Sequence, residues 1–449
     1  MRLPTLRALV LSVAVSASPV AAQSQTSPIA ITDVTVIDGT GRPAQPHMTV
    51  IIANGRIVDL GRTGTLKPRA GAQILDGTGK FAIPGLWNMH VHALNYEHSK
   101  AAFPALLAAG VTGVRDMGAP LDDVLRLRTE TASRVLTGPH ITTPGPLLVR
   151  AMPPDMTGSK MLRVVTSSDE ASDAVSSLKT AGADFIEVEG SASRTVYLAV
   201  AVNARRQHIP FAGHIPPSIT AREASEAGQR SVEHLGGPHH AVLLGCSDRE
   251  AEQRQQLAGM YERGFEAAMR GQDPEPEQMR ANVTKAILGS FSDIKARALF
   301  DRFRRNRTWQ VPTLVALRGL WRQKGLTAED LEYGERIQQK QLDVVGAMAR
   351  AGVRIMAGTD GPMSQAGAAL HDELVLLVKA GLTPMQALQA ATRSPAEFMR
   401  RLRDFGTIER GRVADIVLLD ANPLDDITNT RRVSTVMLGG NVIGNTALR

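Results

Sequence analysis

The sequence contains one cysteine, Cys246, in 449 residues, so no disulfide can form within the chain. Stability must therefore come from a buried core, and we expect Cys246 to be an inert small hydrophobe. Aromatic residues make up only 4% of the chain, and no long basic run accompanies the net charge of +7, which argues against nucleic-acid binding. After the first 22 residues no segment is apolar enough to cross a bilayer, so we expect no membrane contact in the processed protein.

The first residues have the pattern of a secretory signal. Arg2 and Arg7 precede an apolar run from Ala8 to Ala17, and small residues follow as far as Ala22. A membrane anchor is the alternative, but the run is too short to span ~30 Å of hydrocarbon. We therefore predict cleavage after Ala22 and a secreted or periplasmic protein.

The remainder predicts an α/β fold in two parts. Short strands before residue 82 and after residue 405 predict a small β domain built from both chain ends, residues 23–82 and 405–449. Between them, residues 83–404 alternate strands with helices, and several helices end at a glycine, as at Gly182 and Gly228. The eight predicted strands cover residues 83–92, 111–117, 140–144, 183–189, 209–215, 231–235, 309–314 and 354–360.

Eight such strands predict a (β/α)8 TIM barrel. An open doubly wound sheet is the alternative, but the sequence lacks the glycine-rich phosphate turn that would favour it. The longer interval from Ser247 to Arg307 has a helical pattern, and we interpret it as an insertion covering one side of the barrel mouth.

Histidines and carboxylates lie at the carboxyl ends of the predicted strands, where the active sites of such barrels are found. Imidazoles and carboxylates together suit Zn²⁺ or a neighbouring first-row ion. On this basis we predict a centre for one or two divalent metal ions, with zinc as the first choice. The residues that would converge there are His90, His92, Glu187, Glu189, His214, His234 and Asp360.

The order of several motifs resembles the amidohydrolase superfamily, specifically its imidazolonepropionase-like and prolidase-like branch. The resemblance covers nearly the whole chain after the signal. It implies a distorted barrel with a β-sandwich from both ends, and a metal-dependent hydrolase. The motifs that carry it are Pro84-Gly-Leu-Trp-Asn-Met-His-Val-His92, Thr112-Gly-Val-Arg-Asp-Met-Gly118, Gly213-His214, Ser231-Val-Glu-His234, Gly358-Thr-Asp360, His371-Asp-Glu-Leu374 and Gly411-Arg-Val-Ala-Asp415.

By this resemblance, His90, His92 and Asp360 would hold a first metal, and His214 and His234 a second. Asp360 would also be the catalytic proton shuttle. The family usually places a carboxylated lysine where this chain has Glu187. An acidic ligand from this strand is the preferred interpretation, with Glu187 ahead of Glu189; a mononuclear centre with neither as ligand is the alternative.

The implied reaction is hydrolysis of a C–N (amide) bond by metal-activated hydroxide, with a small N-acyl amino acid or dipeptide as substrate. A heterocycle deaminase, a lactone or ester hydrolase, and a metal-binding protein that lost turnover with the lysine remain alternatives. The deaminase branch typically adds a His-X-X-Glu element, whereas Ile-Pro-Pro follows His214 here. The expected partner is a small molecule, and a homo-oligomer remains open.

Three further predictions concern the pocket. Tyr197, just past the fourth strand, and His371, beyond the eighth, are candidates to contact substrate. Arg115 and Asp116 are expected to form a buried ion pair, with a pair facing the substrate as the alternative.

Overall fold

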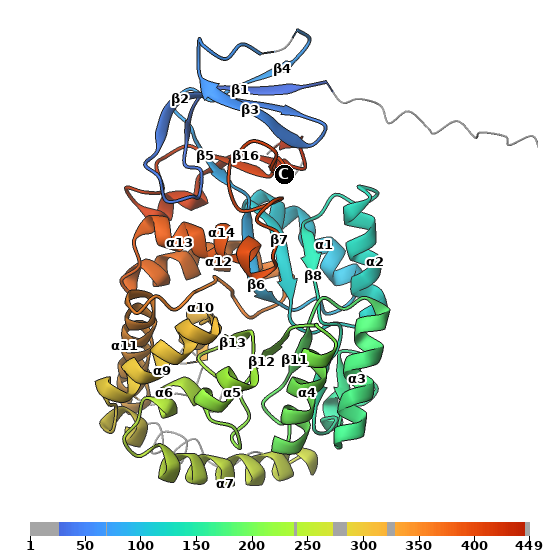
Figure 1. Ribbon diagram of the computed structural model, residues 1–449, viewed down its shortest axis with the longest axis vertical. Helices are drawn as coiled ribbons and strands as arrows, with labels where there is room; N and C mark the ends of the chain where they lie inside the picture. Colours follow the sequence, from blue (N-terminus) through green and yellow to red (C-terminus); the bar gives the residue numbers. More distant parts are fainter. Residues whose placement is uncertain (1–26, 69, 238–239, 273–284, 321–327, 445–449) are drawn as a thin grey trace, which may run out of the picture.

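The two ends of the chain meet in one mixed sheet of eight strands, at the top of the computed structural model in Figure 1. The structure describes residues 27–68, 70–237, 240–272, 285–320 and 328–444, so the predicted signal lies outside the described residues. The sheet order is β17-β16-β15-β5-β1-β2-β3, and β4 pairs with β1. Its strands are β1 (Ile29–Val36), β2 (Gln45–Ala53), β3 (Arg56–Arg62), β4 (Gln73–Asp76), β5 (Phe81–Pro84), β15 (Ile416–Leu419), β16 (Val433–Leu438) and β17 (Asn441–Gly444).

The sheet joins both chain ends because β5, from the N-terminal part, pairs with β15, from the C-terminal part. Apolar side chains of these strands alternate toward a core of their own, which includes Ile31, Val50 and Leu418. The prediction of a β domain built from both ends is confirmed.

The barrel wall consists of parallel strands in two runs, β6-β7-β8 and β10-β9-β11-β12-β13-β14. Seven of the eight predicted barrel strands are present, although several are shorter than expected. Two short strands, β9 and β10, were not predicted. Strand β9 pairs with β10 on one side and with the wall strand β11 on the other. The strands are β6 (Leu86–Val91), β7 (Val111–Asp116), β8 (His140–Thr142), β9 (Leu147–Val149), β10 (Leu162–Val164), β11 (Ile186–Val188), β12 (Phe211–Gly213), β13 (Ser231–Glu233) and β14 (Trp309–Val311).

The eighth predicted strand, residues 354–360, closes the barrel without forming a regular strand. On one side Met356 N donates to Gln310 O at 2.9 Å, and on the other Met89 N donates to Ala357 O at 2.9 Å. The segment ends at Asp360, whose φ of 49° is left-handed and stops the extended ladder. The gap between β8 and β11 is bridged by Asp184 N, which donates to Thr143 O at 2.8 Å.

Helices cover the outside of the barrel, and the predicted glycine caps are present. Gly182 (φ 98°) and Gly228 (φ 94°) end α3 and α5 in the left-handed conformation that glycine adopts most easily. Among the described helices, none has the length and apolar character needed to cross a membrane. The helices are α1 (Tyr96–Ala108), α2 (Leu121–Ala132), α3 (Ser168–Ala181), α4 (Arg194–Arg206), α5 (Ala221–Ala227), α6 (Ala241–Gly245), α7 (Glu250–Met269), α9 (Asp293–Asn306), α10 (Leu314–Leu320), α11 (Ala328–Arg350), α12 (Met363–Lys379), α13 (Pro384–Ala390) and α14 (Arg393–Phe398), with short turns η1 (Pro154–Met156) and η3 (Ile427–Arg431).

Helix α7 is the part of the predicted insertion that covers the barrel mouth. It crosses the end of the molecule farthest from the mixed sheet (Figure 1). Arg254 of α7 donates to Ile219 O at 2.6 Å, in the loop that follows β12. Helix α9, at the end of the same interval, instead packs against α5 as an ordinary barrel helix.

Candidate metal centre

Three histidines bring their Nε2 atoms to the carboxylate of Asp360. His92 Nε2 lies 3.2 Å from Oδ1, and His90 Nε2 lies 3.4 Å from the same oxygen. His234 Nε2 lies 3.7 Å from Oδ2. Two ligands bound to one zinc ion at 2.0–2.1 Å in tetrahedral geometry are ~3.3 Å apart. These separations therefore fit side chains that share a cation.

His90, His234 and Asp360 offer ligand atoms that all lie within 4.8 Å of one another. His214 extends this group, since its ring centroid is 5.1 Å from that of His234. The predicted ligands from the first, fifth, sixth and eighth strands of the barrel are thus close together in space.

Each of three imidazoles is held through its second nitrogen. His90 Nδ1 lies 3.0 Å from Glu233 Oε2, and His234 Nδ1 lies 2.5 Å from Thr313 Oγ1. His214 Nδ1 lies 3.3 Å from Glu189 Oε1. A partner on Nδ1 fixes the ring orientation and leaves Nε2 for a metal, as is usual for histidine ligands.

The surroundings of Glu187 indicate whether the histidines and Asp360 could hold a cation. Its side chain is 2% exposed, and its Oε2 has no hydrogen-bond partner among the described residues. Burial raises the pKa of Glu187 well above its usual range, although the nearby His90 opposes this rise. A buried carboxylate oxygen without a donor is costly, and a bound cation would satisfy it. The residues present therefore fit a divalent ion.

Glu189 differs from Glu187 because its carboxylate is already engaged. It accepts a hydrogen bond from Ser191 N at 2.6 Å and lies against His214. Burial raises the pKa of Glu189, but the contact with His214 outweighs it and lowers the pKa to about 2. Glu189 is thus placed to orient His214, and Glu187 remains the better candidate for the ligand from β11.

Protonation in the centre follows from the same contacts. Burial tends to lower the pKa of His90, but hydrogen bonds to Asp360 and Glu233 raise it to about 10. Burial lowers the pKa of His234 to about 3. Burial would raise the pKa of Asp360, yet the surrounding histidines hold it far below its usual range. Asp360 is therefore ionised at neutral pH.

The backbone at the centre is unusual. Asp360 (φ 49°), His234 (φ 52°) and Thr313 (φ 45°) all adopt left-handed conformations. Such conformations cost free energy outside glycine and concentrate at functional sites. At His234 the turn breaks the alternation of the strand, so that Glu233 and His234 can both face His90.

Close backbone approach also requires glycine here. A Cβ at Gly358 would lie 2.6 Å from Val311 Cγ1 and 2.8 Å from His90 Cβ. The glycine thus allows residues 354–360 to lie directly against β6, which brings Asp360 to His90.

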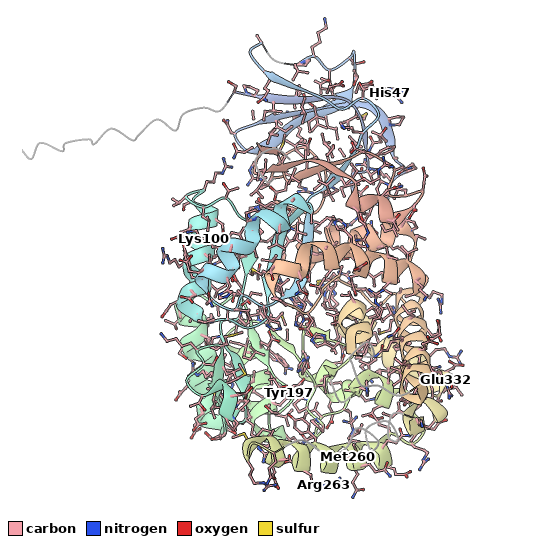
Figure 2. The ribbon with its side chains drawn as sticks, turned by 180° about the vertical axis from the view of Figure 1, so that it is seen from behind. His47, Lys100, Tyr197, Met260, Arg263 and Glu332 are labelled. Atoms are coloured by element: carbon pink, nitrogen blue, oxygen red, sulfur yellow. The ribbon has the colours of Figure 1, made fainter. Side chains whose placement is uncertain are left out.

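The structure corrects the two predictions of substrate contacts. Tyr197, which lies on α4 and is labelled in Figure 2, is fully buried, and its hydroxyl donates to Gln229 Oε1. His371 is 3% exposed, and its two nitrogens lie 3.0 Å from Thr430 Oγ1 and from Ala109 O. Both side chains belong to the core, because α4 and α12 turn these faces inward.

The predicted ion pair of Arg115 with Asp116 is also wrong. Neighbours on a strand point to opposite faces, and these two do so. Arg115 Nη2 donates to Glu233 Oε2 at 2.8 Å, whereas Asp116 accepts from Ala93 N and from Thr143 Oγ1. Cys246 is buried, and burial raises the pKa of its thiol well above the usual range, as expected of an inert residue.

Glu233 and Thr313 are the functional positions that the sequence did not reveal. Glu233 joins Arg115 to His90 and is fully buried. In the sequence, the only feature that indicated Glu233 was its position next to His234. The alternation of side chains along a strand predicted that Glu233 would point away from the metal centre.

Comparison with known proteins identifies a matching family and similar structures. A sequence profile of the amidohydrolase family matches residues 81–443. A solved structure from Bifidobacterium longum, provisionally assigned as a prolidase, is 25% identical, covers 93% of this chain and 94% of its own, and has a TM-score of 0.71. A Xaa-Pro dipeptidase solved with methionine in its active site has 20% identity, covers 93% of this chain and 100% of its own, and has a TM-score of 0.68.

A curated relative matches more locally. The 5-methylthioadenosine/S-adenosylhomocysteine deaminase of Caldanaerobacter subterraneus subsp. tengcongensis is 31% identical over 120 residues. That match spans 22% of this chain and 28% of the deaminase.

Proposed function

The chain belongs to the amidohydrolase family, whose hydrolases act on C–N bonds, and from this membership we propose a prolidase-like enzyme that cleaves dipeptides or small N-acyl amino acids. The observation that carries the proposal is the convergence of His90, His92 and His234 on Asp360, with the unsatisfied Glu187 beside them. The two prolidase-type structures named above support the substrate class.

We propose that His90, His92 and Asp360 hold one divalent ion, with His214, His234 and Glu187 available for a second. When bound, such an ion polarises a carbonyl oxygen and lowers the pKa of water, with zinc as the expected metal. Glu233, Glu189 and Thr313 keep His90, His214 and His234 oriented through their Nδ1 atoms.

Asp360 has the properties of a general base followed by a general acid. Its side chain is 34% exposed, so water and substrate can reach the carboxylate. Asp360 is ionised at neutral pH, and an Oδ atom that water can reach is placed to take the proton of the attacking water. The same oxygen can then return the proton to the leaving nitrogen.

The test uses the protein purified with its metal and a panel of Xaa-Pro dipeptides, other dipeptides and N-acyl amino acids. We expect release of a free amino acid, loss of turnover with a chelator, and recovery on adding Zn²⁺. Asp360→Asn should lower kcat by about 10²- to 10⁴-fold. Asp301→Asn, at an exposed position on α9, is the matched control and should retain full turnover. Tight metal binding without turnover of any of these amides would contradict the proposal.

Deamination is the second candidate because of the partial match to a deaminase. The absence of a His-X-X-Glu element after His214 in the sequence argues against it. Ammonia released from 5′-methylthioadenosine, with no cleavage of the dipeptide panel, would favour deamination.

We also propose that the protein is exported. The charged and apolar pattern of residues 2–22 supports this location. N-terminal sequencing of protein from a cell-envelope fraction should begin at Gln23, and an intact Met1 in the cytoplasm would contradict export.

A further inference from the structure

A large cavity lies at the end of the barrel opposite to the candidate metal centre, where the wall strands begin. Its volume is about 1150 Å³. It is lined by β8, by the residues just before β11, by the first residue of β12 and by the C-terminal parts of α2, α4 and α14. The charged lining side chains are mostly cationic: Arg128, Arg205, Arg230, Arg400, Arg401 and Asp184.

Three of these arginines have internal partners. Arg128 pairs with Asp184 at 2.7 Å, and Arg401 lies 3.4 Å from Asp404. Arg205 donates to Ala227 O at 3.0 Å, at the C-terminal end of α5. Arg128 and Arg401 thus have a carboxylate as counter-ion, and Arg205 is engaged at a helix C-terminus.

Arg230 and Arg400 differ, because no carboxylate among the described residues lies within ion-pair distance of either. The side chain of Arg230 is half-buried, and it makes a long hydrogen bond, 3.5 Å from Nη1 to Arg307 O. Burial lowers the pKa of Arg230, and the cations of Arg400, Arg307 and Arg354 lower it further. Glu397, whose charge opposes this lowering of the pKa, is already paired with Arg354.

The cavity has an apolar side as well. Phe398 forms part of its surface, and the Arg230 guanidinium lies 5.7 Å from the ring centroid. Ala201, Ala204 and Ile209 also line the cavity and are apolar. A ligand that fits would therefore combine an anionic group with an uncharged body, and the volume is that of a small-molecule site.

We propose that this cavity binds a small organic phosphate, with the phosphate oxygens on Arg230 and Arg400. Guanidinium groups donate in pairs to phosphate oxygens, and a doubly charged anion would offset the repulsion among the clustered arginines. The site is separate from the metal centre, since it lies at the N-terminal ends of the strands.

The experiment is calorimetric titration of the metal-loaded protein at low salt with ADP, inorganic pyrophosphate and adenosine. ADP and pyrophosphate should bind, adenosine should not, and added salt should weaken binding. Arg230→Gln and Arg400→Gln should each weaken binding about 10-fold or more, as expected for lost charged hydrogen bonds. Arg206→Gln, beside Arg205 on α4 but outside the cavity lining, is the matched control and should bind normally.

Thermal unfolding separates binding from a merely structural role. Without ligand, Arg230→Gln should melt at the wild-type temperature or above, because repulsion is removed, but ADP should no longer raise its Tm. Binding that persists unchanged in both arginine variants would show chelation at the metal centre and overturn the proposal. The absence of ADP and pyrophosphate binding by the wild-type protein would also overturn it.

Discussion

Glu187 and Glu189 are identical side chains two residues apart, and their surroundings assign them different tasks. Glu187 has an unsatisfied oxygen, whereas Glu189 holds Ser191 N and His214. We predict that Glu187→Gln lowers metal occupancy with little effect on folding, because Oε2 has no hydrogen-bond partner to lose among the described residues. Glu189→Gln should lower metal affinity about 10- to 100-fold by loosening His214.

Metal content per chain, measured by elemental analysis over a series of zinc concentrations, distinguishes the two variants. If Glu187→Gln binds as much zinc as the wild-type protein, Glu187 is not a metal ligand.

Glu233 is the acidic partner of two buried basic side chains, Arg115 and His90. Arg115 and Glu233 are both completely buried, and Glu233 also holds His90. Burial would raise the pKa of Glu233, but Arg115 and His90 lower it to about 2. We predict that Glu233→Gln lowers the free energy of unfolding by about 3–5 kcal/mol, because Arg115 is left buried without its counter-ion.

Urea unfolding in the presence of a chelator measures this loss apart from metal binding. Asp301→Asn, which removes an exposed pair on α9, should cost less than about 1 kcal/mol under the same conditions. Equal losses in the two variants would contradict a special role for Glu233.

Among the elements, helix α10 depends on a carboxylate from another helix. Glu373 of α12 accepts a hydrogen bond from Val315 N at 2.8 Å, in the first turn of α10. The helix follows Thr313, which holds His234. Burial raises the pKa of Glu373 from 4.5 to about 8, although the backbone of α10 lowers it in part. The folded protein therefore binds a proton on Glu373 that the unfolded chain has released.

The sign of the pH effect follows from this raised pKa. The contribution to stability is complete below pH 4.5, declines as the pH rises from 4.5 to about 8, and is lost above that. We predict that wild-type stability falls by a few kcal/mol between pH 5 and 9 through this group. Glu373→Gln cannot titrate, so its decline in urea unfolding should be smaller. If the free energies of unfolding of the two proteins change with pH in the same way, the pH effect does not come from Glu373.

At the scale of the whole molecule, the mixed sheet and the barrel are joined without a linker. Strand β5 ends at Pro84 and β6 begins at Leu86, while Gly85 N donates to Asp415 O at 2.9 Å. Asp415 also lies 2.9 Å from His140 Nε2 on β8. We predict a single calorimetric unfolding transition for the metal-loaded protein, because neither part can lose its structure without disturbing the other. Two separated transitions would show independent units.

Much of this architecture could be predicted from the sequence, because it depends on local periodicity and on chemistry at strand ends. The alternation of apolar strands with amphipathic helices predicted the barrel wall, and the glycines at 182 and 228 marked helix ends correctly. Histidines at successive strand ends predicted the centre, since parallel strands bring their carboxyl ends to one face.

What the sequence by itself determined was therefore the fold, the family resemblance and the group of candidate ligands. The tertiary structure alone decided which neighbours share a face and which side chains are buried. The left-handed backbone at His234 turned Glu233 toward His90, and the packing of α4 and α12 buried Tyr197 and His371. These outcomes depend on contacts between residues far apart in the chain, which periodicity along one segment cannot encode.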